Sequence, residues 1–371
     1  MNKTVFTLAM GLSLLCFQPQ VQANTTEIVQ EYAALVYDNY TKTHADAVAL
    51  QTAINAFLDN PNDETQNAAK QTWLISRDSY GQTEAFRFYE GPIDFADENG
   101  NEGPEGRLNA WPLDEAYIDY VQGNEKAGLV NNAGVDITKA SLTDTNQADD
   151  EAEVSTGYHA IEFLLWGQDL SLDSAGQRPA SDYAKTPENE RRRKYLKVVT
   201  DLMVDDLAFL MKEWAPAQDN FAKGFLQDEG ALSKIMTALA TLSGFELASE
   251  RMATSLDSGD QEDEHSCFSD NTHNDFIMNQ QGIMNVFFST GIYEYLKERE
   301  NDLAEALENQ ILDTHKMLKE LPFPIDREIL ATPKGSASRA KMEETVTALQ
   351  NQADLFKKAG GALGITVSIN E

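Results

Sequence analysis

The chain has 371 residues, 42% of them hydrophobic, and its 61 acidic side chains outnumber 29 basic ones for a formal net charge of −32. This excess of negative charge argues against nucleic acid or anionic lipid as the main ligand, because both are polyanions. It attracts cations instead, although keeping the protein in solution is the simplest purpose of the acidity. The length suits two domains rather than one.

The first 23 residues have the pattern of a secretory signal. Lys3 is followed by an apolar run over residues 5–17 and by a small-x-small cleavage site at residues 21–23. That run is shorter than the roughly 20 residues that span a bilayer. We predict cleavage after Ala23 and a periplasmic location, and we leave association with a membrane open. No later segment is apolar enough to cross a bilayer, and loss of Cys16 with the signal would leave no intramolecular disulfide.

Apolar residues recur at helical spacing along most of the chain. The predicted helices are residues 28–57, 64–89, a helix that opens at Thr186-Pro187-Glu188 and includes 196–210, and then 231–252, 282–297, 302–318 and 341–358. Alternating strand patterns are nearly absent. We therefore predict an all-α fold of two four-helix-type bundles packed side by side, with an N-terminal bundle at 24–183 and a C-terminal bundle at 184–371.

Three stretches break the helical pattern, namely residues 91–110, 144–155 and 255–274. Long irregular segments inside compact domains are often functional. In each half of the chain, a helix with glycine, glutamate and arginine leads into such a segment and then to a histidine near a carboxylate. This similarity between the two halves predicts that the two bundles are related by internal duplication.

The clearest local signal for chemistry is the pair His159 and Glu162. On a helix the two side chains lie on one face, one turn apart, where they could share a metal ion or hydrogen-bond to each other. Gly157 would allow another backbone or a ligand to come close. The apolar run at 163–166 indicates that the helix is buried, and buried charged groups need partners. The simpler alternative is a structural hydrogen bond between His159 and Glu162.

A second group of polar residues lies in the irregular segment 255–274. It comprises His265, Ser269, Asp270 and His273, with Asp275 directly after the segment. The two histidines and the acid between them could reach one ion. The same residues could equally cap a helix that begins near Thr272, and the sequence favours neither reading.

The motif Gly157-x-His159-x-x-Glu162 resembles the signature of the imelysin-like family. Three further stretches agree with it: residues 73–94 (WLISRDSYGQTEAFRFYEGPID), 109–120 (NAWPLDEAYIDY) and 264–275 (EHSCFSDNTHND). The last resembles the iron-regulated protein A branch of that family. The resemblance covers nearly all of the chain after the signal. It implies two related helical bundles with a site between them, export, and a role in bacterial iron acquisition. The family also carries a metallopeptidase label.

Similarity to metal-binding modules of ferrous uptake systems implies two further ligands, Glu84 and Asp114. The competing interpretation of Glu84 is an ordinary ion pair with Arg87, one turn away. A site with one imidazole and several carboxylates suits a divalent metal, with iron favoured and zinc as the alternative.

We therefore expect a periplasmic protein of iron acquisition that binds a metal ion or an iron chelate between its bundles. A membrane iron-transport component is a further candidate partner, and nucleic acid is not. The alternatives are a metallopeptidase and a non-catalytic interaction module. Catalysis is not favoured, because catalytic zinc usually has three protein ligands and a nearby general base, whereas the sequence provides one His-x-x-Glu pair.

Overall fold

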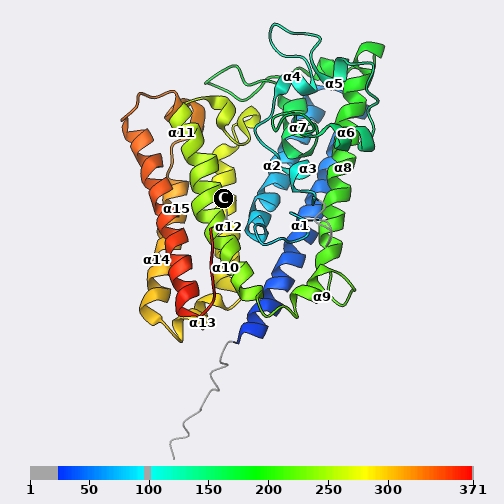
Figure 1. The fold of residues 1–371 in the computed structure, drawn as a ribbon. Coiled ribbons are helices and arrows are strands. Elements are labelled where there is room, and N and C mark those ends of the chain that lie inside the picture. The colour runs from blue at the N-terminus through cyan, green and yellow to red at the C-terminus, as the bar shows by residue number, and fades with distance from the viewer. Residues whose placement is uncertain (1–23, 96–101, 370–371) are drawn as a thin grey trace, which may run out of the picture.

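The computed structural model describes residues 24–95 and 102–369, and within these ranges the regular structure is helical, with two isolated bridges and no strand. Two groups of long helices stand side by side (Figure 1). The predicted all-α class is confirmed. The predicted signal at 1–23 lies outside the described residues. None of the described helices is long and apolar enough to span a membrane.

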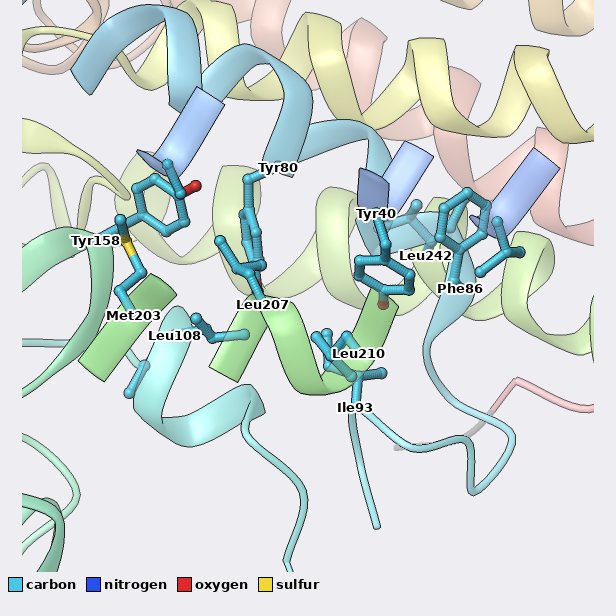
Figure 2. Close-up of a cluster of buried hydrophobic side chains, with 14 of the residues drawn as sticks. Tyr40, Tyr80, Phe86, Ile93, Leu108, Tyr158, Met203, Leu207, Leu210 and Leu242 are labelled. Carbon is cyan, nitrogen blue, oxygen red and sulfur yellow. The ribbon is translucent and has the colours of Figure 1, made fainter. Parts of the chain in front are cut away.

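The first bundle is built on four helices. They are α1 (Thr25–Asp59), α2 (Asp63–Thr83), α7 (Gly157–Trp166) and α8 (Glu190–Trp214). α1 packs along both α2 and α8, and α7 packs against α2 and α8. Figure 2 shows their buried side chains meeting in one core, which includes Tyr40 of α1, Tyr80 of α2, Tyr158 of α7 and Leu207 of α8.

Local chemistry explains the joint between α1 and α2. The segment Asn60-Pro61-Asn62 lies between the two helices and separates them. Asn62 then caps α2, because its side chain accepts from the backbone N–H groups of Glu64 and Thr65 at 3.0 and 3.1 Å. The Thr65 side chain accepts in turn from the Asn62 backbone, which completes a capping box.

The second bundle is built on five longer segments. They are α10 (Ala231–Thr241), the π-helical segment η4 (Leu242–Ala253) that continues it, α12 (Thr272–Ser289), α14 (Asn301–Lys319) and α15 (Ala337–Ala362). α15 packs against α10, η4 and α14, and α12 packs against α14. A second apolar cluster lies here, with Met252, Phe276, Leu318 and Leu349 among its buried members.

Short helical elements connect these helices. In chain order they are η1 (Glu84–Phe86), α3 (Glu105–Leu108), α4 (Glu115–Ile118), α5 (Gly128–Asn131), α6 (Lys139–Thr145), η2 (Ala180–Tyr183), η3 (Pro187–Asn189), α9 (Phe221–Phe225), α11 (Thr254–Ser258), η5 (Gln261–Asp263), η6 (Cys267–Ser269), α13 (Ile292–Lys297) and η7 (Asp326–Leu330). Many lie within or beside the stretches whose pattern is irregular in the sequence. α4, α6 and α11 lie at the same end of the molecule as α7, whereas α9 and α13 lie at the opposite end (Figure 1).

Three sequence-based details need correction. The expected domain boundary at 183/184 assigns α8 to the second bundle, but α8 packs along α1, so the bundles divide after α9. The single helix expected over 282–297 is two helices, because Gly291 adopts a φ of +87° between α12 and α13. The helix expected to open at Thr186-Pro187-Glu188 begins with the short turn η3 at Pro187, and α8 itself starts at Glu190.

The two bundles meet along α2 and α12, which pack closely. Two glycines permit this approach. A Cβ atom on Gly81 would lie 2.9 Å from Cβ of Met278, and one on Gly282 would lie 2.4 Å from the carbonyl oxygen of Gln82. Asn279 of α12 donates to the carbonyl oxygen of Gly81 at 2.9 Å. The interface therefore brings the backbones of α2 and α12 into near contact.

Candidate functional site

The short helix α7 carries the histidine and the glutamate that the sequence singled out. It begins at Gly157, whose φ of +85° is unfavourable for a residue with a side chain. A Cβ atom there would lie 2.6 Å from the carbonyl oxygen of Leu108. The close backbone approach expected at Gly157 is therefore present, and it places α7 against the segment that leads to Trp111. The Trp111 and His159 ring centroids are 4.9 Å apart.

His159 and Glu162 are fully buried and contact each other directly. Nδ1 of His159 lies 2.9 Å from Oε2 of Glu162. The opposite ring nitrogen, Nε2, faces Nε2 of His265 at 3.0 Å. His265 lies in the short connection between η5 and η6, so the contact joins the first bundle to the irregular segment of the second.

Ser269 of η6 completes the environment of Glu162. Its backbone N–H and its hydroxyl donate to Oε1 of Glu162 at 2.9 and 2.7 Å. Burial raises the pKa of Glu162 to about 8, but the Ser269 donors favour the ionised form, and the hydrogen bonds around both oxygens are those of a carboxylate. Both oxygens of Glu162 therefore have partners, and neither is free to face a cavity.

Arg77 of α2 fixes His265 from the other side. Its Nε and Nη2 groups donate to the carboxylate of Asp275 in α12 at 2.9–3.1 Å, and Nη2 lies 3.1 Å from Nδ1 of His265. Nη1 donates to the side-chain oxygen of Asn109. Oδ2 of Asp275 also lies 3.4 Å from Nδ1 of His265. Each imidazole therefore has a carboxylate beside Nδ1, and the two Nε2 atoms face each other.

These contacts determine where the ring protons lie. Arginine has only N–H donors, so Nδ1 of His265 accepts and its proton is on Nε2. Nε2 of His159 must then accept, and the His159 proton is on Nδ1, which donates to Glu162. Burial lowers the pKa of both histidines well below the usual value, and the positive charge of Arg77 adds to the effect. Both rings are therefore neutral at pH 7.

A cavity of about 450 Å³ opens beside His265, between the two bundles. Its lining includes Trp111 and Asn109 from the first bundle and Arg251 from η4. Two arginines and five acids contribute to the walls, namely Arg87, Arg251, Glu105, Glu151, Glu246, Glu250 and Asp263. The acidic excess makes the cavity attractive to a cation.

Glu84 and Arg87 both lie in an ionic network at the edge of this cavity. Oε2 of Glu84 accepts from Arg251 at 2.6 Å and from Arg87 at 3.1 Å. Arg87 also pairs with Glu105 at 3.0 Å, and Arg251 with Glu246 at 2.7 Å. The positive charges of Arg251 and Arg87 outweigh burial and lower the pKa of Glu84 to about 2. The competing ion-pair interpretation of Glu84 therefore describes this structure, and its carboxylate is not free to ligate a metal.

The remaining sequence candidates lie apart from His159. Asp114 is exposed, and its side chain caps α4 by accepting from the Ala116 backbone at 2.9 Å. His273 stacks on Phe323, and its Nε2 lies 2.8 Å from the carbonyl oxygen of Leu318. Neither Asp114 nor His273 lies where it could share a metal ion with His159. Asp270 belongs to a separate cluster of carboxylates, described below.

Sequence reasoning missed Arg77, Asn109 and Glu105 as site residues. Arg77 is 2% exposed in the middle of α2, and it connects Asp275 with His265. A single arginine in a helical pattern is usually a solvated residue, so only the stretch 73–94, quoted for its resemblance, contained a signal. Arg77 neutralises Asp275 in an interior where an isolated charge would be costly.

The architecture and this buried centre define a two-bundle, histidine- and carboxylate-containing protein, and comparison with known proteins gives its family. The model of the family described as Imelysin matches residues 36–356, and the chain belongs to that family. Iron-regulated protein A of Synechococcus elongatus is 23% identical over 355 residues, which are 91% of this chain and 86% of that protein. A provisionally named iron-regulated protein A precursor from Parabacteroides distasonis has a solved structure that matches with a TM-score of 0.68 and 16% identity, over 92% of this chain and 97% of that chain. At this identity the structural match shows a shared fold.

Proposed function

We propose that the protein binds a divalent metal ion, with iron favoured over zinc, between the Nε2 atoms of His159 and His265, and that it serves bacterial iron acquisition in the periplasm. The observation that carries the proposal is the paired arrangement of imidazoles and carboxylates. Glu162 lies beside Nδ1 of His159 at 2.9 Å, and Asp275 lies beside Nδ1 of His265 at 3.4 Å. Metal-binding histidines are typically oriented by such a carboxylate at the nitrogen that does not bind.

The present geometry is close to what one ion requires. Two nitrogens that bind one tetrahedral metal at about 2.0–2.1 Å are roughly 3.4 Å apart, and the two Nε2 atoms are 3.0 Å apart. A small movement of the loop that carries His265 would admit the ion. The proton on Nε2 of His265 must then move to Nδ1, where Asp275 can accept its hydrogen bond, and Arg77 must release its own contact with Nδ1.

In this proposal Glu162 orients His159 instead of sharing the ion with it. The other positions around the metal face the acidic cavity, where Glu250 and Asp263, which lie outside the arginine network, or a chelating ligand can supply oxygen donors. Hard oxygen donors with imidazole suit ferrous iron and zinc. The name of the Synechococcus relative supports iron.

The metallopeptidase alternative has less support in the geometry. A general base must reach a metal-bound water. Glu162 is fully buried behind His159 and does not line the cavity. If His159 and Glu162 form only a structural hydrogen bond, as in the interaction-module alternative, replacing them should leave metal binding unchanged. The titration below therefore also tests that alternative.

The test is calorimetric titration of the purified protein with ferrous iron under anaerobic conditions and with zinc. We expect His159→Ala and His265→Ala each to weaken metal binding by roughly 100-fold or more, because each removes one metal donor. His273→Ala is the matched control, since His273 is partly buried outside the site. Unchanged affinity in both site variants, or equal loss in the control, would reject the proposal.

A further inference from the structure

A second group of carboxylates lies on the far side of the loop that carries His265. Asp169, Asp270 and Asp326 each place one oxygen within 4.8 Å of the others. Asp169 follows α7, Asp270 follows η6, and Asp326 begins η7. A residue of the first bundle therefore meets residues from two separate segments of the second bundle.

Asp326 gives the independent sign that this cluster takes a ligand. The residue is 3% exposed, and neither of its carboxylate oxygens has a hydrogen-bond partner. The nearby backbone N–H groups of Asp326 and Arg327 favour its ionised form without reaching hydrogen-bond geometry. A buried carboxylate without donors costs several kcal/mol unless a cation or a proton compensates it.

The neighbours provide only part of that compensation, because the positive charge of Arg327 favours ionised Asp326 and Asp270 from beyond ion-pair distance. Among the described residues, no lysine or arginine forms an ion pair with any of the three aspartates. Arg327 lies nearby, but its guanidinium contacts Glu328 at 2.8 Å and Asp173 at 3.9 Å. Glu264 adds a fourth buried carboxyl whose Oε1 has no partner. Burial, together with the other carboxylates, raises the pKa of Asp270 to about 7.

We propose that Asp169, Asp270 and Asp326 bind a calcium ion, which clamps the loop 264–271 to both bundles. All the donors are oxygens, which hard cations prefer. Calcium binds oxygen at about 2.3–2.6 Å in flexible geometry, so ligands on opposite sides of one ion lie up to roughly 5 Å apart. Magnesium, at about 2.0–2.1 Å, requires a tighter arrangement.

The location gives this ion a consequence for the first site. Asp270 follows Ser269, which donates twice to Glu162, and the same loop contains His265. Gln261 donates to Oδ2 of Asp169 at 2.6 Å, so the segment just before the loop is tied to the same residue. Calcium would hold the loop in the position that places His265 opposite His159.

Thermal unfolding and calorimetry of the whole protein test the proposal, with calcium chloride, magnesium chloride or the chelator EGTA added. We expect calcium to raise the melting temperature by several degrees over EGTA, and Asp326→Asn to weaken calcium binding at least tenfold and remove most of that rise. In EGTA, Asp326→Asn should melt at the wild-type temperature or above it, because a neutral amide relieves the repulsion. Its stability in EGTA therefore shows that the variant folds.

Asp173→Asn is the control, because Asp173 is an exposed acid in the same loop as Asp169. It should keep the full calcium effect. The double variant His159→Ala with Glu162→Ala should also keep it, which separates this site from the metal site of the proposed function. The proposal is overturned if calcium gives neither heat nor a melting shift, if Asp326→Asn responds like the wild type, or if magnesium acts as strongly as calcium.

Discussion

Glu162 shows how one side chain can set the chemistry of another through a hydrogen bond. Its carboxylate accepts from Nδ1 of His159 and twice from Ser269, and both of its oxygens are used. This leaves Nε2 of His159 as the free acceptor on the side of His265. The role of Glu162 is therefore to select a tautomer and to hold a ring.

Replacing Glu162 with glutamine tests that role. Glutamine keeps the size of the side chain, but its amide NH2 group donates and cannot accept. It therefore cannot accept from both His159 and Ser269, and His159 loses its fixed tautomer. We expect affinity for ferrous iron or zinc to fall by about 10–100-fold, the usual effect of losing such a partner. Titration calorimetry measures the change. An affinity within twofold of the wild type would show that Glu162 does not orient the metal-binding ring.

Glu84 carries a different prediction, on acid stability. Arg251 and Arg87 hold its folded-state pKa at about 2, below the usual 4.5. The stabilisation is fully present above about pH 4.5 and is lost as the pH falls toward 2. At pH 6, Glu84→Gln should lower the free energy of unfolding by about 3 kcal/mol, because two buried arginines lose their charged partner.

Urea unfolding of the wild type and of Glu84→Gln, at several pH values from 6 to 3, checks this expectation. The difference between the two proteins should shrink as the pH falls below 4.5. Glu343→Gln, at an exposed position of α15, should show no such trend. A difference that is constant over the whole range would mean that Glu84 is not ionised preferentially in the folded state.

Among the elements, α7 depends most on a single backbone position. Gly157 has a φ of +85° and packs against the carbonyl oxygen of Leu108. We expect Gly157→Ala to lower the free energy of unfolding by at least about 2 kcal/mol, from backbone strain and from the clash together. Gly123→Ala is the control, since Gly123 has a φ of +83° but nothing within 4 Å of an added Cβ.

Denaturant unfolding of the two variants separates the cost of backbone strain, which both share, from the cost of the clash with Leu108, which only Gly157→Ala has. The control should lose about 1 kcal/mol, the strain alone. Equal losses in Gly157→Ala and Gly123→Ala would show that the approach of α3 to α7 does not matter for stability. A larger loss of stability in Gly157→Ala supports the interpretation that the contact between α3 and α7 holds α7, and with it His159, in place.

At the scale of the whole molecule, the contact of α2 with α12 aligns the two halves of the site. His159 belongs to the first bundle, whereas His265 lies in the loop that precedes α12. An added Cβ at Gly282 would lie 2.4 Å from the Gln82 carbonyl oxygen. Relief of that clash must move one bundle relative to the other.

We therefore expect Gly282→Ala to weaken metal binding although no site residue changes, and to destabilise the protein by roughly 2 kcal/mol. Gly224→Ala, in α9 with open space around it, should be neutral or slightly stabilising because alanine favours helix. Calorimetry and thermal unfolding measure both effects. If Gly282→Ala keeps full metal affinity, the bundle interface does not align the site.

The sequence predicted the helices well because their signals are local. Apolar spacing placed both ends of α1 and the start of α2 within about three residues of those observed, whereas α2 ends at Thr83, before the predicted end at residue 89. The motif at Gly157 to Glu162 indicated both the family and a buried helix. Its spacing could not show whether the glutamate binds a metal or orients the histidine, because both roles need the same separation of three residues.

By itself, then, the sequence determined the all-α class, the family and the central pair His159 and Glu162. Only the tertiary structure decided that His159 faces His265, 106 residues away, and that Arg77 pairs with Asp275, 198 residues away. Helical periodicity specifies neighbours three and four positions apart, and it carries no information about which distant helix packs against them. The partners of a buried charge are set by that packing.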